Sequence, residues 1–233
     1  MSLSELDQIR SFADPERAAG QAAYHKVARE YLGIPNPVLN DLTKTWRKEL
    51  DVPGRIDLAR ALWDTDIHEA RVAAAKLLTQ ARIRPDDDVW ALLTSWLPDF
   101  DAWAIADHAC MAMQKRLIAD PSRLDDVEAW TQSQHMWTKR AAMVATLPWT
   151  KQNHPKPEEL VARDRILGWA AGYVPDHDWF IQKSIAWWLR ELSKHDAPRV
   201  RDFLDAHGEG MKPFARREAG KYLEKNLKDQ EAG

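Results

Sequence analysis

Residues 179–194 read WFIQKSIAWWLRELSK and carry the clearest helical pattern in the chain. At 100° per residue, its large apolar side chains fall on one face, as in a helix with one buried side. The members of this core stripe are Ile181, Ile185, Trp188, Leu189 and Leu192. Trp187 falls on the far side together with Lys183 and Arg190. Trp187 is therefore either packed under a neighbouring helix or an aromatic platform beside a phosphate-binding strip.

The same spacing of three and four recurs outward from this segment and predicts helices along most of the chain. Candidate capping pairs such as Asp14-Pro15 and Asn36-Pro37 mark helix starts. We expect helices near residues 3–12, 15–31, 37–50, 54–63, 67–82, 86–97, 102–118, 121–131, 134–147, 157–171, 179–194, 197–206 and 213–228. No segment alternates with period two between turn residues, so strands are not expected.

The predicted helices tend to come in pairs. The helices starting at Ile67, Ala102, His135 and Trp179 are the second members, and their starts lie 33 to 44 residues apart. That spacing is close to the period of HEAT-like repeats of two helices each. The sequence therefore predicts an all-α, curved α-solenoid of HEAT-like helix pairs, an ARM/HEAT-like superhelix, as a single domain over residues 1–233. A plain helical bundle is the alternative.

The composition is that of an ordinary globular protein. Of the 233 residues, 45% are hydrophobic and 30% are charged, which argues against a disordered chain. The single cysteine, Cys110, is expected to be buried and cannot form an internal disulfide. No apolar run is long enough to cross a bilayer and the start resembles no signal peptide, so we expect a cytoplasmic protein without a membrane partner.

The net charge of −3 counts against nucleic-acid binding unless basic residues gather on one face. Lys44 and Arg47 cluster on the helix near 37–50, where they form a solvated face or phosphate contacts; we assign them to DNA binding. A second basic segment lies at the end of the chain, and it is either solvated or DNA-binding. Its cations are Lys212, Arg216, Arg217, Lys221, Lys225 and Lys228.

Two further helices carry candidate site residues. Trp103 and Asp107 lie four residues apart, opposite the main apolar face of their helix, so they can act on one ligand; the alternative is a solvated acid beside a packed indole. Arg140 falls within the apolar stripe of the helix near 134–147, where it must snorkel, pair with a carboxylate or face a polar groove. Tyr24 and Tyr31 follow helical spacing with Val27, which favours core packing for them.

Several stretches resemble one protein family. Residues 180–191, FIQKSIAWWLRE, resemble the signature helix of the AlkD family of DNA alkylation repair glycosylases. Residues 31–35, 137–142 and 216–219 are similar to other parts of that family's pattern, and they occur in the right order. The resemblance spans residues 15–228. It implies a stack of HEAT-like repeats that hydrolyses the glycosidic bond of cationic bases such as 3-methyladenine and 7-methylguanine, in base excision repair and without flipping the base into a pocket.

The resemblance also implies roles for individual residues. Asp107 corresponds to the family's catalytic acid, and Trp103 and Trp187 correspond to its active-site tryptophans. Arg140 corresponds to an arginine of the concave surface and Tyr24 to a tyrosine that contacts DNA. We add Lys183 and Arg190 as phosphate contacts. The implied enzyme uses no cofactor and no metal, acts on double-stranded DNA with alkylated bases, and is expected to be a monomer.

Two other hypotheses compete with the glycosylase hypothesis. The chain could be a non-catalytic relative that binds DNA structures, or a helical-repeat module that binds a protein partner. The net charge and the acidic run Asp86-Asp87-Asp88 favour the protein-binding reading. The neighbouring Trp188 leaves open which indole meets a ligand, although the helical angles favour Trp187.

Overall fold

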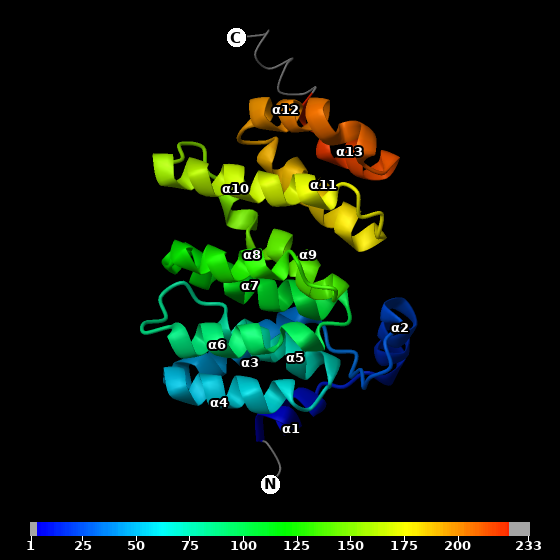
Figure 1. Cartoon of the computed structure of the whole chain (residues 1–233). Helices are drawn as coiled ribbons and strands as arrows, with labels where there is room; N and C mark the ends of the chain where they lie inside the picture. The colour runs from blue at the N-terminus through cyan, green and yellow to red at the C-terminus, as the bar shows by residue number, and fades with distance from the viewer. Residues whose placement is uncertain (1–3, 224–233) are drawn as a thin grey trace, which may run out of the picture. The chain divides into compact units, whose positions relative to one another are not determined.

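The computed structural model describes residues 4–223, and every regular element within that range is helical (Figure 1). The all-α prediction is confirmed for the described part of the chain. The chain divides into two compact units, residues 1–119 and 120–233. The predicted single domain over residues 1–233 stays a prediction.

The first unit contains two helix pairs, α4 with α5 and α6 with α7, and the second members of these pairs form one layer with α3. Helix α5 packs against α3, α4 and α7, and α6 packs against α7, so α3, α5 and α7 form one layer with α4 and α6 behind it. Cys110 is buried in α7, as expected. The helices of this unit are α1 (Ser4–Arg10), α2 (Pro15–His25), α3 (Asn36–Glu49), α4 (Val52–Trp63), α5 (His68–Leu78), α6 (Asp87–Ser95), η1 (Leu97–Asp99) and α7 (Trp103–Ala119).

The second unit repeats this arrangement. Helix α11 packs against α9 and α13, while α8 packs against α9 and α10 against α11. Its helices are η2 (Pro121–Arg123), α8 (Leu124–Trp130), α9 (Met136–Ala145), η3 (Leu147–Thr150), α10 (Pro157–Tyr173), α11 (Trp179–Leu192), α12 (Ala197–His207), η4 (Gly208–Gly210) and α13 (Pro213–Ala219).

The predicted pairing is confirmed. The second members of the pairs begin at His68, Trp103, Met136 and Trp179, each within one residue of the predicted start. The last predicted helix ends earlier, because α13 stops at Ala219. The predicted residues beyond 223, Lys225 and Lys228 among them, lie outside the described part.

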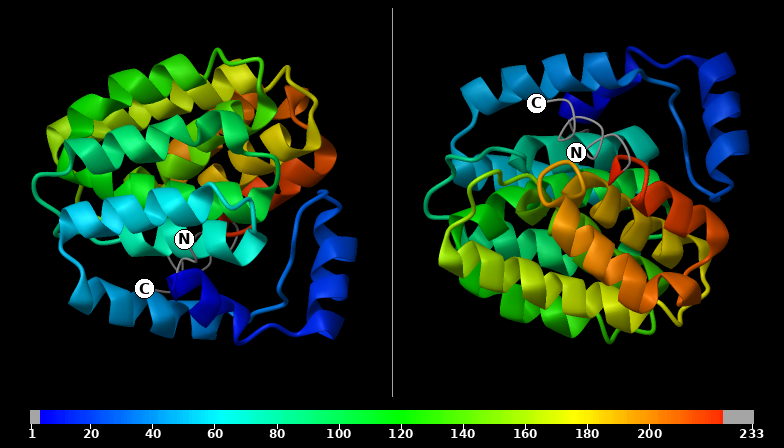
Figure 2. Two further views of the ribbon diagram at one scale, coloured as in Figure 1. Left: turned by 90° about the horizontal axis from the view of Figure 1, so that it is seen from below. Right: turned by 90° about the horizontal axis from the view of Figure 1, so that it is seen from above.

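Helix α2 is shorter than the predicted helix 15–31. It ends at His25 because Lys26 takes a left-handed conformation with φ of 57°, and an extended segment, residues 26–35, follows (Figure 2). The prediction of core packing is wrong for Tyr24, whose side chain is 68% exposed. Tyr31 is buried, but it belongs to the extended segment and not to a helix.

A buried carboxylate holds the extended segment in place. Glu69 of α5 is 1% exposed, and its two oxygens accept the backbone N–H groups of Leu32, Gly33 and Ile34 at 2.8 to 3.2 Å. Gly33 has φ of +75°, and a Cβ atom there would lie 2.2 Å from the carbonyl oxygen of Asp14. This geometry explains why residues 31–35 require a glycine at their centre.

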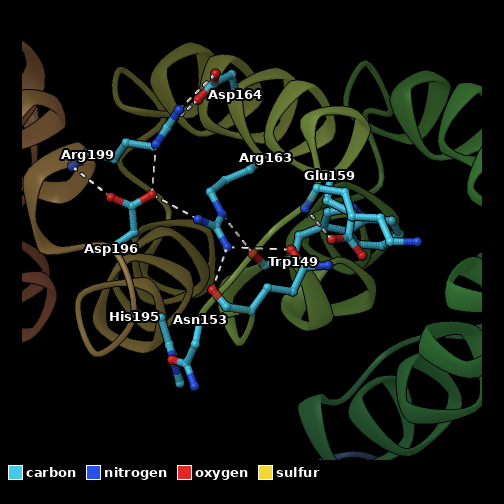
Figure 3. Close-up of polar contacts among 10 residues, drawn as sticks. Trp149, Asn153, Glu159, Arg163, Asp164, His195, Asp196 and Arg199 are labelled. Carbon is cyan, nitrogen blue, oxygen red and sulfur yellow. Dashed lines mark hydrogen bonds and ion pairs between the residues drawn. The ribbon is translucent and has the colours of Figure 1, made fainter.

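A buried arginine plays a similar part in the second unit (Figure 3). Arg163 of α10 donates to the carbonyl of Trp149 at 3.0 Å and to the carboxylate of Asp196 at 2.8 Å. Asp196 also caps α12 and pairs with Arg199 at 2.9 Å. Arg163 thereby ties η3, α10 and the start of α12 together.

Candidate functional site

Helix α11 has the two faces that its sequence predicts. All five residues of the core stripe are fully buried, Trp188 among them. Trp187, Lys183 and Arg190 are only half-buried. The interpretation that Trp187 lies off the core is therefore confirmed, and it is the indole of this pair that retains exposed surface.

The two cations on that side of α11 have a carboxylate partner. Lys183 Nζ and Arg190 both form ion pairs with Glu218 of α13, the latter at 2.5 Å. Arg190 also lies 3.1 Å from Glu191. A phosphate that binds Lys183 or Arg190 would have to compete with Glu218.

Arg140 of α9 is enclosed in the second unit. Its side chain is buried, so the snorkelling alternative is wrong. The guanidinium lies over the ring of Trp137, with Cζ 5.6 Å from the ring centroid. This cation–π contact orients Arg140 within residues 137–142, one of the stretches that resembles the family pattern.

The first unit brings together two of the predicted site residues from distant parts of the sequence. Trp103 opens α7 and keeps an exposed ring, and Tyr24 of α2 meets it edge-on with ring centroids 6.2 Å apart. Asp107 follows one turn later on α7 and is half-buried. Trp103, Asp107 and Tyr24 thus belong to the first unit, while Trp187 and Arg140 belong to the second.

A pocket of about 180 Å³ opens beside Trp103. Its walls include Tyr24 and three histidines, His25, His68 and His108, and we name it the histidine pocket. The ring of His25 lies 4.8 Å from that of His68 and 5.6 Å from that of Trp103. Sequence reasoning missed these histidines, because each stands on a different helix and no local spacing links them.

Burial controls the charge of the histidine pocket. Desolvation, reinforced by His25 and Arg29, lowers the pKa of His68 to about 3. Desolvation also lowers the pKa of His25 and that of His108. The pocket therefore presents neutral imidazoles near neutral pH.

A second hollow of about 140 Å³ lies further along α3, α5 and α7, and His108 lines both cavities. Arg47 and Lys76 line this cationic hollow with Thr43 and Thr79. Burial lowers the pKa of Arg47 and that of Lys76, and a neighbouring guanidinium lowers each further. An anion bound there would relieve this repulsion.

The other predicted cation of α3 lies elsewhere. Lys44 is exposed and does not line the cationic hollow. Lys76, which sequence reasoning missed, lines it and donates to Asn40 Oδ1 at 2.7 Å.

A family model described as DNA alkylation repair enzyme matches residues 6–223. The chain belongs to this family. The match extends over both units and includes every residue assigned above to the candidate site. The resemblance seen in the signature helix is thereby confirmed at the level of the family.

Solved structures share the fold. A predicted DNA alkylation repair enzyme from Enterococcus faecalis is 24% identical, with a TM-score of 0.76 over 91% of this chain and 96% of that one. AlkD2 from Streptococcus mutans is 16% identical, with a TM-score of 0.59 over 89% and 98% of the two chains. The protein smu.31 from Streptococcus mutans UA159 is 18% identical, with a TM-score of 0.59 over 79% and 91%. At these identities the likeness concerns the fold alone. No match was found among curated proteins.

Among residues 4–223, no group of three or more histidine, cysteine, aspartate or glutamate side chains could hold a metal ion. Within the same residues, no helix combines the length and the apolar character that a membrane span requires.

Proposed function

We propose that this member of the DNA alkylation repair enzyme family is a glycosylase that hydrolyses the N-glycosidic bond of cationic alkylated purines, 3-methyladenine and 7-methylguanine, in double-stranded DNA as a step of base excision repair. The observation that carries the proposal is the pair Trp103 and Asp107, one turn apart on α7, with the Tyr24 ring edge-on to Trp103. Family membership supports the same conclusion.

The proposed reaction needs little catalytic assistance at the leaving group. A purine alkylated at N3 or N7 carries a positive charge and is already a good leaving group. The protein must stabilise the sugar cation that develops as the bond breaks, which an anion beside the sugar does. Asp107 supplies that anion and orients or deprotonates the attacking water. This reaction needs no group beyond the side chains and water.

The aromatic side chains select the lesion. The indole face of Trp103 contacts the deoxyribose and the cationic base, and Trp187 is a second candidate aromatic contact to DNA. Cation–π attraction of about 0.5 to 2 kcal/mol favours a charged lesion over a neutral base. Trp187 can serve because Trp188 takes the buried position of α11.

Cations hold the flanking phosphates in this proposal. Arg47 binds a phosphate in the cationic hollow, with Lys44 exposed nearby on the same helix. Lys183 and Arg190 exchange Glu218 for phosphate when DNA binds. Arg140, held over Trp137, contributes charge from within the second unit.

The test is release of 7-methylguanine from methylated duplex DNA under single-turnover conditions. Asp107→Asn should bind the duplex as the unmodified protein does and lose most of the release, on the order of a hundredfold or more, because the amide carries no charge. The matched control is Asp57→Asn, which changes an exposed carboxylate on α4. Undiminished release by Asp107→Asn would remove Asp107 from the mechanism. Binding without any release by the unmodified protein would favour a non-catalytic DNA-binding module.

A further inference from the structure

Three residues that line the histidine pocket each carry a buried polar atom without a hydrogen-bond partner. Gln21 Oε1, His25 Nδ1 and His68 Nδ1 are buried and unpartnered, and all three residues line the pocket. His68 is only 7% exposed. Buried polar atoms are nearly always hydrogen-bonded in folded proteins, so three such atoms around one cavity indicate a ligand with donors and acceptors of its own.

The walls determine the shape and charge of that ligand. The rings of Tyr24, His25 and Trp103 surround the cavity and offer faces and edges to a planar molecule. The Glu69 carboxylate also lines it, but both of its oxygens already accept backbone N–H groups. Because the imidazoles are neutral, the pocket favours an uncharged ring over an anion.

The size of the cavity limits the ligand further. Sites for drug-sized ligands enclose about 300–1,000 Å³. A cavity of about 180 Å³ is smaller and suits one ring system without a sugar or phosphate. The cations that would hold a phosphate line the separate cationic hollow.

We propose that the histidine pocket binds a free purine base, the product of the proposed reaction. A purine is planar and uncharged when released, and its edges carry the donors and acceptors that the unpartnered atoms of Gln21, His25 and His68 require. The identity of this ligand rests on the proposed function, because a glycosylase is what generates free methylated purines. We assign the pocket to the base after the glycosidic bond is broken, because its volume of about 180 Å³ suits the ring system alone.

Binding of 7-methylguanine, 3-methyladenine and adenine is measured by calorimetry and by saturation-transfer NMR, in the absence of DNA. The two test variants are His68→Phe, which removes the buried Nδ1 atom, and Gln21→Leu, which changes a half-buried residue on α2 and leaves the core intact. The control is His154→Phe, an exposed histidine in the second unit. We expect saturable binding to the unmodified protein and to the control, and weakening by about fivefold or more in each test variant.

A second arm uses duplex DNA. Added free base should inhibit excision by the unmodified protein and by His154→Phe. It should inhibit excision by Gln21→Leu to a smaller extent. The proposal for the histidine pocket is overturned if none of the three bases binds, or if all variants bind equally well, even when excision is normal. Binding of the bases without excision retains the pocket and overturns the proposed function, so the two failures are distinguishable. Binding of a base only within an oligonucleotide also overturns the proposal, because it would assign the cavity to a base still joined to its sugar.

Discussion

The indole Nε1–H of Trp188 donates a hydrogen bond to the backbone carbonyl of Thr146 at 3.3 Å, and both residues are fully buried. This contact joins α11 to the end of α9 and fixes the rotation of α11 about its own axis. Consecutive residues of a helix point 100° apart, so a buried Trp188 turns Trp187 away from the core. The two adjacent tryptophans should therefore respond to substitution in opposite ways.

Trp188→Ala should destabilise the protein by about 3–5 kcal/mol, because it empties the core and leaves the Thr146 carbonyl without its donor. Trp187→Ala should change the free energy of unfolding much less, by about 1 kcal/mol, and should reduce release of 7-methylguanine instead. Chemical denaturation and single-turnover release measure the two effects. Equal destabilisation by both variants would make Trp187 a core residue as well.

Glu218→Gln should strengthen DNA binding, because Lys183 and Arg190 lose the anion that pairs with both of them. Since the proposed complex already places a phosphate on each cation, K should rise at every salt concentration while the slope of log K against log salt stays the same. Titration of a labelled duplex at several salt concentrations measures K and the slope. Glu209→Gln, an exposed carboxylate in η4, is the control. An unchanged affinity in Glu218→Gln would show that neither cation contacts DNA.

Much of the fold could be predicted because its signals are local. The core stripe of α11 and the starts of α5, α7, α9 and α11 follow from spacing within one helix. The end of α2 could not be predicted, because it depends on a left-handed Lys26 and on the segment held by Glu69 from another helix. The apolar spacing continues from Tyr24 to Tyr31, although the helix itself ends at His25.

The candidate site was predictable only in part for the same reason. Trp103 and Asp107 share one helix, so their spacing was visible in the sequence. The two cavities are instead lined by side chains from different helices, which come together only when the helices pack. Examples are His25 and His68 in the histidine pocket and Lys76 in the cationic hollow. Likewise, no local pattern connects Glu218 with the cations of α11.

Glu69→Gln should destabilise the protein by about 3 kcal/mol. The substitution removes the charge that accepts three backbone N–H groups of residues 32–34, and it turns an amide NH₂ toward a donor. Because residues 26–35 lead from Tyr24 and His25 to α3, base binding in the histidine pocket should weaken as well. Denaturation against Glu49→Gln, an exposed carboxylate on α3, measures the effect. Equal stability of the two variants would show that the contacts of Glu69 with residues 32–34 do not stabilise the fold.

The histidine pocket should make stability depend on pH below the ordinary range of histidine. The pKa of His68 is lowered to about 3 in the folded protein, so the unfolded chain binds a proton first as the pH falls. The stabilisation is complete above an unfolded pKa of about 6.5 and is lost at up to about 1.4 kcal/mol per pH unit between that value and the folded pKa.

Between about pH 7 and about pH 5, His68 alone should account for a loss of about 2 kcal/mol. The variant His68→Phe lacks this proton, so its free energy of unfolding should fall by about 2 kcal/mol less than that of the unmodified protein over the same interval. Denaturant titrations of both proteins at the two pH values give this difference directly, and carboxylates elsewhere cancel from it. His154→Phe, which changes an exposed histidine, should show the pH dependence of the unmodified protein. If His68→Phe retains the full dependence, His68 titrates as an exposed imidazole does, and the pocket is open to water at that side chain.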